Sequence, residues 1–155
     1  MLQRVQSIYL LLAGLVIFTL FLFPIAHNVY VEGKPITIAV TGTYWDVNGQ
    51  QILKDHFVAL TAATAVVGLI PLVIIFLYKN RKQQIMLCYV AILLIIGYSF
   101  WMAQTAKGVT NGVTLETHNF GIGMGICPLS IVLIILAFKA IQRDEKLIKS
   151  ADRLR

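Results

Sequence analysis

The side chains of this chain best suited to bind a metal ion belong to three histidines, because imidazole is a common ligand for transition metals. His27, His56 and His118 each stand where a long apolar segment meets a polar one. No two of them have the helical or hairpin spacing that directs two ligands at one ion, and the amphipathic imidazole also suits such boundaries. We predict no metal site, and we keep the three histidines as candidates for a metal-dependent membrane enzyme.

Other catalytic arrangements have little support in the sequence. The serines are isolated, with no base beside them, and no paired carboxylates occur in or near the apolar segments. An active site would depend on polar residues between those segments, namely Asp46, Asp55, Glu116 and His118. Their spacing does not distinguish them from solvated loop residues. We therefore expect no enzymatic activity and no cofactor.

Two prolines lie inside apolar segments, and they motivate an alternative function. Pro71 and Pro128 each remove a backbone donor and are predicted to kink a helix. Broken helices line the binding sites of some transporters, so a small transporter or a lipid- or quinone-handling protein is the alternative. Gly121 and Gly125 have the small-xxx-small spacing that predicts close contact between membrane helices.

The composition indicates which kind of fold positions these residues. Of the 155 residues, 58% are hydrophobic and 13% are charged, whereas soluble domains have about 25% charged residues. A single domain of this size cannot bury so much apolar sequence in water, so lipid is the expected solvent. Cys88 and Cys127 lie inside apolar runs, and we predict no disulfide.

Four apolar segments are long enough to cross a bilayer. A helix rises 1.5 Å per residue, so about 20 residues span a hydrocarbon core about 30 Å thick. The expected spans are residues 8–26, 57–78, 85–104 and 120–141. The sequence thus predicts an all-α membrane protein, a four-helix transmembrane bundle in one domain, 1–155. The six residues between the second and third spans predict an antiparallel helical hairpin.

The basic residues predict the orientation of these spans. Ten lysines and arginines fall on the side that holds both termini, and three fall on the other side, which are Lys34, Lys54 and Lys107. The positive-inside rule then places both termini in the cytoplasm. Because membrane insertion explains the net charge of +6, we expect no nucleic-acid partner. The first span is longer than the apolar core of a signal peptide, and we interpret it as a retained anchor.

The outer loops, 27–56 and 105–119, have the character of β-hairpins. In the first loop, β-prone runs are separated by Glu32-Gly33-Lys34-Pro35 and by Asn48-Gly49. The second loop contains another Asn-Gly pair, Asn111-Gly112, and Asn-Gly favours a tight hairpin turn. Because a two-stranded hairpin is marginal alone, we predict one small antiparallel sheet built from both loops.

The C-terminal tail, residues 142–155, is predicted to be a cytoplasmic amphipathic helix that continues the fourth span or lies along the membrane. Its apolar residues recur at steps of three to four. A plain stop-transfer tail is one interpretation, and a docking helix is the other. The residues predicted to bind a partner are Arg143, Lys146, Leu147, Lys149, Asp152 and Arg153.

Both ends of the chain resemble a known family. The opening residues, Met1 to Ala13, and the ending, Arg143 to Arg155, are similar to those of a Bacteroidota family of uncharacterised four-helix membrane proteins. The resemblance implies a bacterial inner-membrane location and four spans, and it supplies no catalytic or binding residue. A shared terminal motif also implies that the tail is recognised by another molecule.

These patterns together predict a non-enzymatic inner-membrane protein. Apart from the lipid bilayer, its expected partner is a membrane or cytoplasmic protein, bound through the tail and the outer loops. In that role it would be an accessory or assembly subunit.

Overall fold

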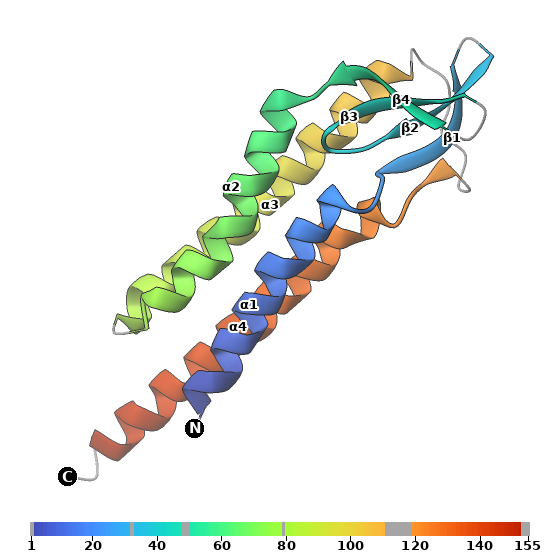
Figure 1. Cartoon of the computed structure of the whole chain (residues 1–155). Helices are drawn as coiled ribbons and strands as arrows, with labels where there is room; N and C mark the ends of the chain where they lie inside the picture. The colour runs from blue at the N-terminus through green and yellow to red at the C-terminus, as the bar shows by residue number, and fades with distance from the viewer. Residues whose placement is uncertain (1, 32, 48–49, 79, 111–118, 153–155) are drawn as a thin grey trace.

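A computed structural model describes residues 2–31, 33–47, 50–78, 80–110 and 119–152. The elements are α1 (Leu2–Phe18), η1 (Thr19–Phe21), β1 (Ala26–Val31), β2 (Lys34–Ile38), β3 (Gly42–Val47), β4 (Gln50–His56), α2 (Val58–Phe76), α3 (Arg81–Val109) and α4 (Gly123–Asp152). The helices lie side by side in an elongated bundle, with the sheet at one end and both termini at the other (Figure 1). The chain is therefore mostly helical, with a sheet inserted between its first two helices.

The bundle interior is built from one stripe of residues on each helix. Helix α1 packs on α4 and α2, and α3 packs on the same two helices. The buried residues recur at steps of three or four, as in packed helix bundles. On α1 they include Gln6, Leu10, Ala13 and Ile17, and on α4 they include Cys127, Ser130, Ile134, Ala137, Ile141 and Asp144.

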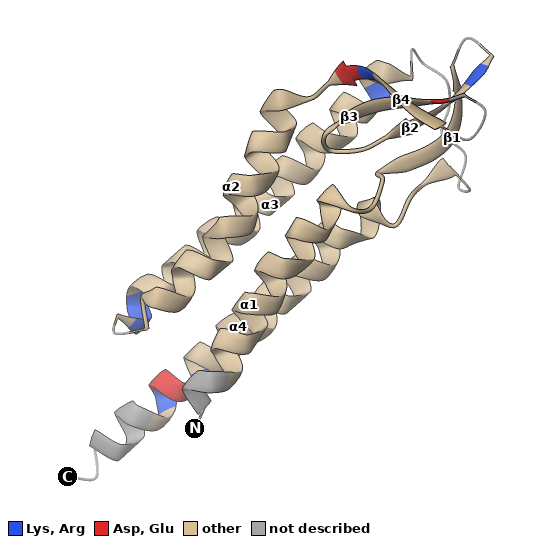
Figure 2. Ribbon diagram, in the orientation of Figure 1, with Lys and Arg blue, Asp and Glu red and all other residues tan. Residues whose placement is uncertain are grey.

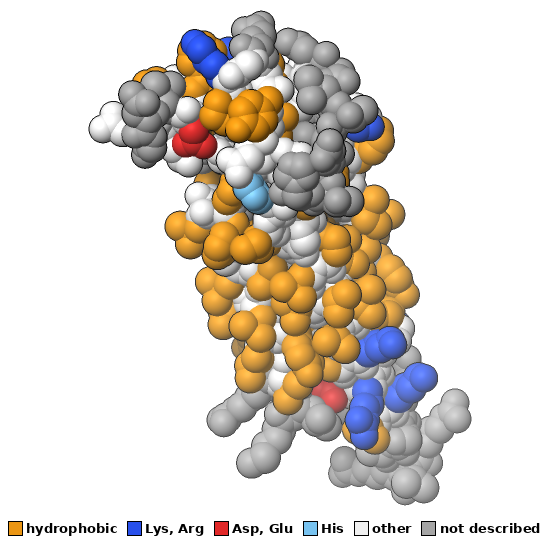
Figure 3. Space-filling model, turned by 90° about the vertical axis from the view of Figure 1, so that its right-hand side faces the viewer, with side chains coloured by type: hydrophobic (Ala, Val, Ile, Leu, Met, Phe, Trp, Pro, Cys, Tyr) orange, Lys and Arg blue, Asp and Glu red, His pale blue; other side chains and the backbone are white. Residues whose placement is uncertain are grey.

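The outside of the bundle is apolar. Leu93 and Phe100 on α3 are 68% and 66% exposed, and hydrophobic side chains form a band between the sheet and a basic end (Figure 3). Among the described residues, α2, α3 and the Gly123–Leu147 part of α4 are long and apolar enough to cross a membrane, whereas the apolar stretch Val5–Phe21 is shorter. The protein is thus a multi-pass membrane protein by the length and composition of its helices.

The first apolar segment is helical over less of its length than predicted. Helix α1 and η1 end at Phe21, and Ala26, which was expected to end the span, begins β1. Pro24 explains the early end, since proline has no N–H and disfavours helical geometry at the residue before it. The third helix is longer than predicted at both ends, and α4 begins at Gly123.

The sheet is an antiparallel meander in the order β1-β2-β3-β4. Val31 pairs with Lys34 and Val47 pairs with Gln50, so both hairpins predicted in the first loop are confirmed. Lys34 and Pro35, which were expected in the first turn, belong to β2 instead. Gly33 has a φ of +76° in the first turn, a conformation that glycine adopts without strain. The buried face of the sheet includes Val29, Ile36 and Ile38.

The prediction that both loops build the sheet is wrong for the described residues. All four strands come from residues 26–56. Val109, which was expected in a strand of the second loop, is the last residue of α3. Residues 111–118, with the Asn111-Gly112 pair, lie outside the described residues. Among the described residues, the chain after this gap meets the sheet through Asn119, at the end of the second loop, and through an isolated bridge between Ala26 and Phe120.

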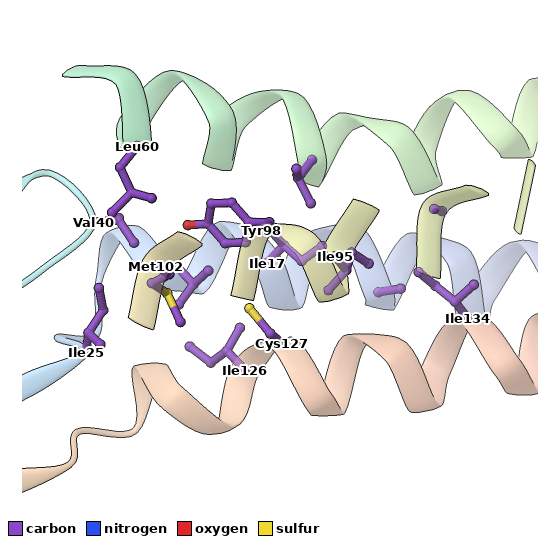
Figure 4. Packing of buried hydrophobic residues seen from close by; sticks show 14 of the residues in the cluster. Ile17, Ile25, Val40, Leu60, Ile95, Tyr98, Met102, Ile126, Cys127 and Ile134 are labelled. Atoms are coloured by element: carbon purple, nitrogen blue, oxygen red, sulfur yellow. The ribbon is translucent and has the colours of Figure 1, made fainter. Parts of the chain in front are cut away.

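The base of the sheet is bonded to the ends of the helices. The Phe57 amide donates to the Thr41 carbonyl over 3.1 Å, and the Thr61 hydroxyl donates to the Val40 carbonyl over 3.0 Å. Figure 4 shows Val40 beside Leu60 of α2. These bonds join the β2–β3 turn to the first turn of α2.

The prediction that Gly121 and Gly125 together let membrane helices approach closely is wrong. Gly121 precedes α4, and a Cβ there would collide with the Pro24 carbonyl, whereas a Cβ on Gly125 would have no neighbour within 4 Å. The closest helix approach through glycine involves Gly14 of α1, where a Cβ would lie 3.0 Å from the Gly68 carbonyl of α2. Gly14 and Gly68 are 54 positions apart, so spacing within one helix could not reveal their contact.

Candidate functional site

The two edges of the sheet differ in how they are covered. On β1, Phe120 forms a bridge with Ala26. The Asn119 side-chain amide donates to the carbonyls of His27 and Asn28, over 3.3 and 2.7 Å. These contacts occupy backbone groups of β1, so the segment after residue 118 covers that edge.

The opposite edge belongs to β4. All seven residues of this strand are exposed, and among the described strands it pairs with β3 alone. The β3–β4 ladder is irregular between Thr43 and Tyr44, opposite the charged end of β4. The regular part of β4 carries two neighbouring exposed apolar residues, Ile52 and Leu53. An edge of this kind can accept another strand.

A tryptophan and two lysines link three neighbouring strands. The Lys34 ammonium of β2 lies 4.5 Å from the centre of the Trp45 ring in β3, and that of Lys54 in β4 lies 5.3 Å from it. Cation–π attraction at these distances stabilises exposed pairs by about 0.5–1 kcal/mol. On the other face, the Thr37 hydroxyl donates to the Asp46 carboxylate over 3.1 Å. Figure 2 marks in blue the positions of lysines on the ribbon at this end of the molecule.

A pocket of about 200 Å³ lies between the sheet and the turn that follows η1. On the sheet side it is lined by polar residues that include Thr37, Thr41, Tyr44 and Gln51. The hydroxyl oxygens of Thr41 and Tyr44 are hydrogen-bonded at 2.8 Å. The turn contributes apolar residues to the lining, which are Phe21, Leu22, Phe23 and Pro24. The pocket therefore has one polar and one apolar wall.

Polar groups inside the bundle bond neighbouring helices together. The hydroxyls of Thr64 on α2 and Tyr98 on α3 are 2.6 Å apart, and the Ser130 hydroxyl on α4 donates to the Ala13 carbonyl over 3.1 Å. Tyr98 lies in the same interior region as Cys127 (Figure 4). These bonds satisfy buried polar groups and support packing rather than chemistry.

The α2–α3 turn holds a less satisfied group of polar atoms. The buried Gln84 side chain donates to the Ile74 carbonyl over 3.2 Å. Its Oε1 atom, Arg81 Nη1 and Thr43 Oγ1 are buried without a hydrogen-bond partner among the described residues. Two of these three atoms stand near the start of α3.

The structure does not bring the described histidines together. His27 lies in β1 and His56 at the end of β4, on opposite edge strands of the sheet. His118 lies outside the described residues. In the described ranges, no group of three His, Cys, Asp or Glu side chains could hold a metal ion. Asp46 and Asp55 lie on β3 and β4, and Glu116 falls outside the description.

The two prolines have different surroundings. Pro71 is buried within α2, whereas Pro128 is exposed on α4. The pocket described above lies at the sheet end and has neither proline in its lining.

The tail continues α4 without a break as far as Asp152. Arg143, Lys146 and Leu147 are exposed, whereas Asp144 is buried and continues the inner stripe. Of the other residues predicted to bind a partner, Lys149 and Asp152 have helical backbone and Arg153 lies outside the described residues.

A protein-family model matches residues 2–154 of this chain, and it is described as a domain of unknown function, DUF4293. The chain belongs to this family. No match was found among curated proteins. Because the DUF4293 match covers nearly the whole chain, the sheet and the tail are both parts of the family's domain rather than additions to a bundle.

Proposed function

We propose that this protein is a non-enzymatic accessory subunit of the inner membrane of Bacteroidota, and that it binds a partner protein through the open edge of its sheet. The observation that supports this proposal most directly is β4, a strand that is exposed at every residue. In this proposal the bundle anchors the sheet at the outer membrane surface.

The bundle geometry supports four crossings with both termini in the cytoplasm. Helix α1 and η1 reach from the terminal end of the bundle to the sheet end (Figure 1). Helix α1 packs along both α2 and α4, which supports a fourth crossing beside theirs. The ten-to-three division of basic residues then directs the termini inward and the sheet outward.

The contrast between the two sheet edges supports an extended protein segment as the partner. An uncovered edge strand offers unpaired N–H and C=O groups, which an added strand can bond. The β1 edge is covered by residues 119–120, whereas the Gln50–Leu53 part of β4 has no charged residue to repel a neighbour. A strand added there would also cover Ile52 and Leu53.

The tail provides a second contact surface in this proposal. Helix α4 places Arg143, Lys146 and Leu147 on its exposed surface, beyond the apolar part of the bundle. A cytoplasmic or membrane protein bound there would be coupled to the outer partner through one rigid helix.

The experiment is purification of the intact protein in mild detergent, followed by identification of bound proteins and backbone hydrogen exchange on the complex. Leu53→Pro removes the N–H of an edge residue, and Leu53→Ala is the matched control that shortens the side chain alone. We expect the partner to be lost with Leu53→Pro and retained with Leu53→Ala, because an added strand requires main-chain bonds.

In the complex, the amides of Gln51 to Leu53 should also exchange more slowly than in the free protein. Retention of the partner by Leu53→Pro, or unchanged exchange at β4, would contradict the proposed edge. A variant truncated after Gln142 tests the tail separately. The proposal expects this variant to lose the second partner, which is the cytoplasmic or membrane protein bound to the tail.

A further inference from the structure

The pocket beneath the sheet has a chemistry that the proposed docking role does not use. Its position is defined by the Leu22–Pro24 turn, where the chain leaves the first helix and enters the sheet. The Pro24 carbonyl accepts a bond from the Gly123 amide at the start of α4, and the sheet base is bonded to the start of α2. The pocket therefore lies at the level where two apolar helices begin, which is the lipid–water boundary.

The apolar wall opens toward lipid. Leu22 is 78% exposed and its neighbour Phe23 is 40% exposed. Apolar side chains at this depth can contact the upper part of an acyl chain without a cost in water exposure. A ligand that occupies the pocket can thus have a hydrocarbon portion lying against these two residues.

The polar wall is uncharged. Among the described residues, its lining includes no Lys, Arg, Asp, Glu or His. Thr37, Tyr44 and Gln51 project from the same face of the sheet, as their cross-strand register requires. A phosphate or carboxylate bound here would have no cation to compensate its desolvation, which disfavours an anionic ligand.

The available hydrogen-bonding groups are both donors and acceptors. The bond between the Thr41 and Tyr44 hydroxyls uses one of their two O–H groups, and leaves the other O–H and several lone pairs. Gln51 adds two donors and one acceptor. Hydroxyl groups donate and accept in the same way, so a polyhydroxylated group matches this wall.

We infer that the pocket binds the uncharged, hydroxylated headgroup of a membrane lipid, such as a glycosyl diacylglycerol. The volume of about 200 Å³ is below the roughly 300 Å³ at which pockets for drug-sized molecules begin. It accommodates a headgroup, and the acyl chains remain in the bilayer beside Leu22 and Phe23. The lipid would be a fixed neighbour of the sheet base.

The test uses the full chain in nanodiscs that contain equal amounts of monoglucosyl diacylglycerol and phosphatidic acid with the same acyl chains. Lipid retained after mild extraction is measured by native mass spectrometry. We expect the glucosyl lipid to be retained in preference to phosphatidic acid. The variant Thr41→Val with Tyr44→Phe should reduce its retention about thirtyfold, since two hydrogen bonds contribute about 1 kcal/mol each.

The matched control is Tyr30→Phe with Thr105→Val, which removes one tyrosine and one threonine hydroxyl outside the pocket lining. Gln51→Leu is a second variant that leaves the Thr41–Tyr44 pair intact and should also reduce retention. Equal retention of phosphatidic acid, unchanged retention in both pocket variants, or an equal loss in the control would overturn the assignment. Displacement of the lipid by free methyl glucoside alone would also overturn it, because the ligand would then be a soluble sugar.

Discussion

The outer surface of the bundle exposes Leu93 and Phe100, whereas the sheet buries Val29, Ile36 and Ile38 and exposes β4. Both regions belong to one chain and are bonded to each other at the base of the sheet. Their opposite patterns follow from two solvents. Exposing a leucine side chain to lipid has no free-energy cost, whereas exposing it to water does.

The comparison also predicts what stabilises each region. The sheet depends on apolar burial, because water drives its hydrophobic face inward. The bundle gains little from removing apolar surface from lipid, so close packing and interhelical hydrogen bonds must hold it together. Gly14 against Gly68 and Thr64 against Tyr98 are examples of these two interactions.

The largest expected effect is in the sheet. Ile38→Ala removes a side chain that is 0% exposed, and should lower the free energy of unfolding by about 3 kcal/mol. Unfolding can be followed by Trp45 fluorescence in a Trp101→Phe background. Ile52→Ala, at a position 51% exposed, should cost about 0.5 kcal/mol or less. Equal losses in the two variants would contradict the difference in burial.

Close packing in the bundle is tested by Gly14→Ala. The new Cβ would lie 3.0 Å from the Gly68 carbonyl and from the Leu72 side chain, and should lower stability in detergent by about 2 kcal/mol. Gly97→Ala meets no atom within 4 Å, and should instead raise stability by about 0.5 kcal/mol, as alanine is the better helix former. A stabilising effect at Gly14 would refute the close α1–α2 contact.

The hydrogen bond inside the bundle should contribute less. Tyr98→Phe removes the hydroxyl that is bonded to Thr64, at an expected cost of about 0.6 kcal/mol, the average for such bonds in membranes. A double-mutant cycle with Thr64→Val measures the coupling between the two residues. Strictly additive losses would show that the two hydroxyls act independently.

The smallest effect is expected on the lipid-facing surface. Leu93→Ala should change stability in detergent by about 0.5 kcal/mol or less, because Leu93 packs against solvent molecules rather than protein. Ile95→Ala, two positions away and 1% exposed, should cost about 2 kcal/mol or more. If Leu93→Ala were the more damaging change, the surface around it would be a protein interface.

The local features of the fold were predictable, and the contacts between distant segments were not. The two hairpins of the first loop follow from their turn residues, and the helical tail follows from its periodicity. That periodicity did not decide whether the tail continues α4 or lies along the membrane. The second loop was misjudged at Val109, since a helix that satisfies its own backbone can extend where strand-like residues begin. The glycine contact was misplaced at Gly125 because spacing within one helix does not show which face meets a neighbour.

The candidate site depends on long-range contacts more than the local elements do. The outer loops were expected to bind a partner, but nothing in their residues distinguishes the β4 edge, which no described segment covers, from the covered β1 edge. That difference arises where Asn119 reaches the carbonyls of His27 and Asn28, 91 or 92 positions earlier. The pocket was not predicted either, because Phe21 and Gln51 become neighbours only when the sheet folds back on the turn.

Hydropathy and charge alone establish a multi-pass membrane protein with a basic terminal side, because transfer into lipid is a property of each segment taken separately. Which sheet edge stays open, where two helices touch and what lines the pocket are set by the packed fold. Those features depend on residues that meet from distant parts of the chain, and their geometry has no counterpart in local composition.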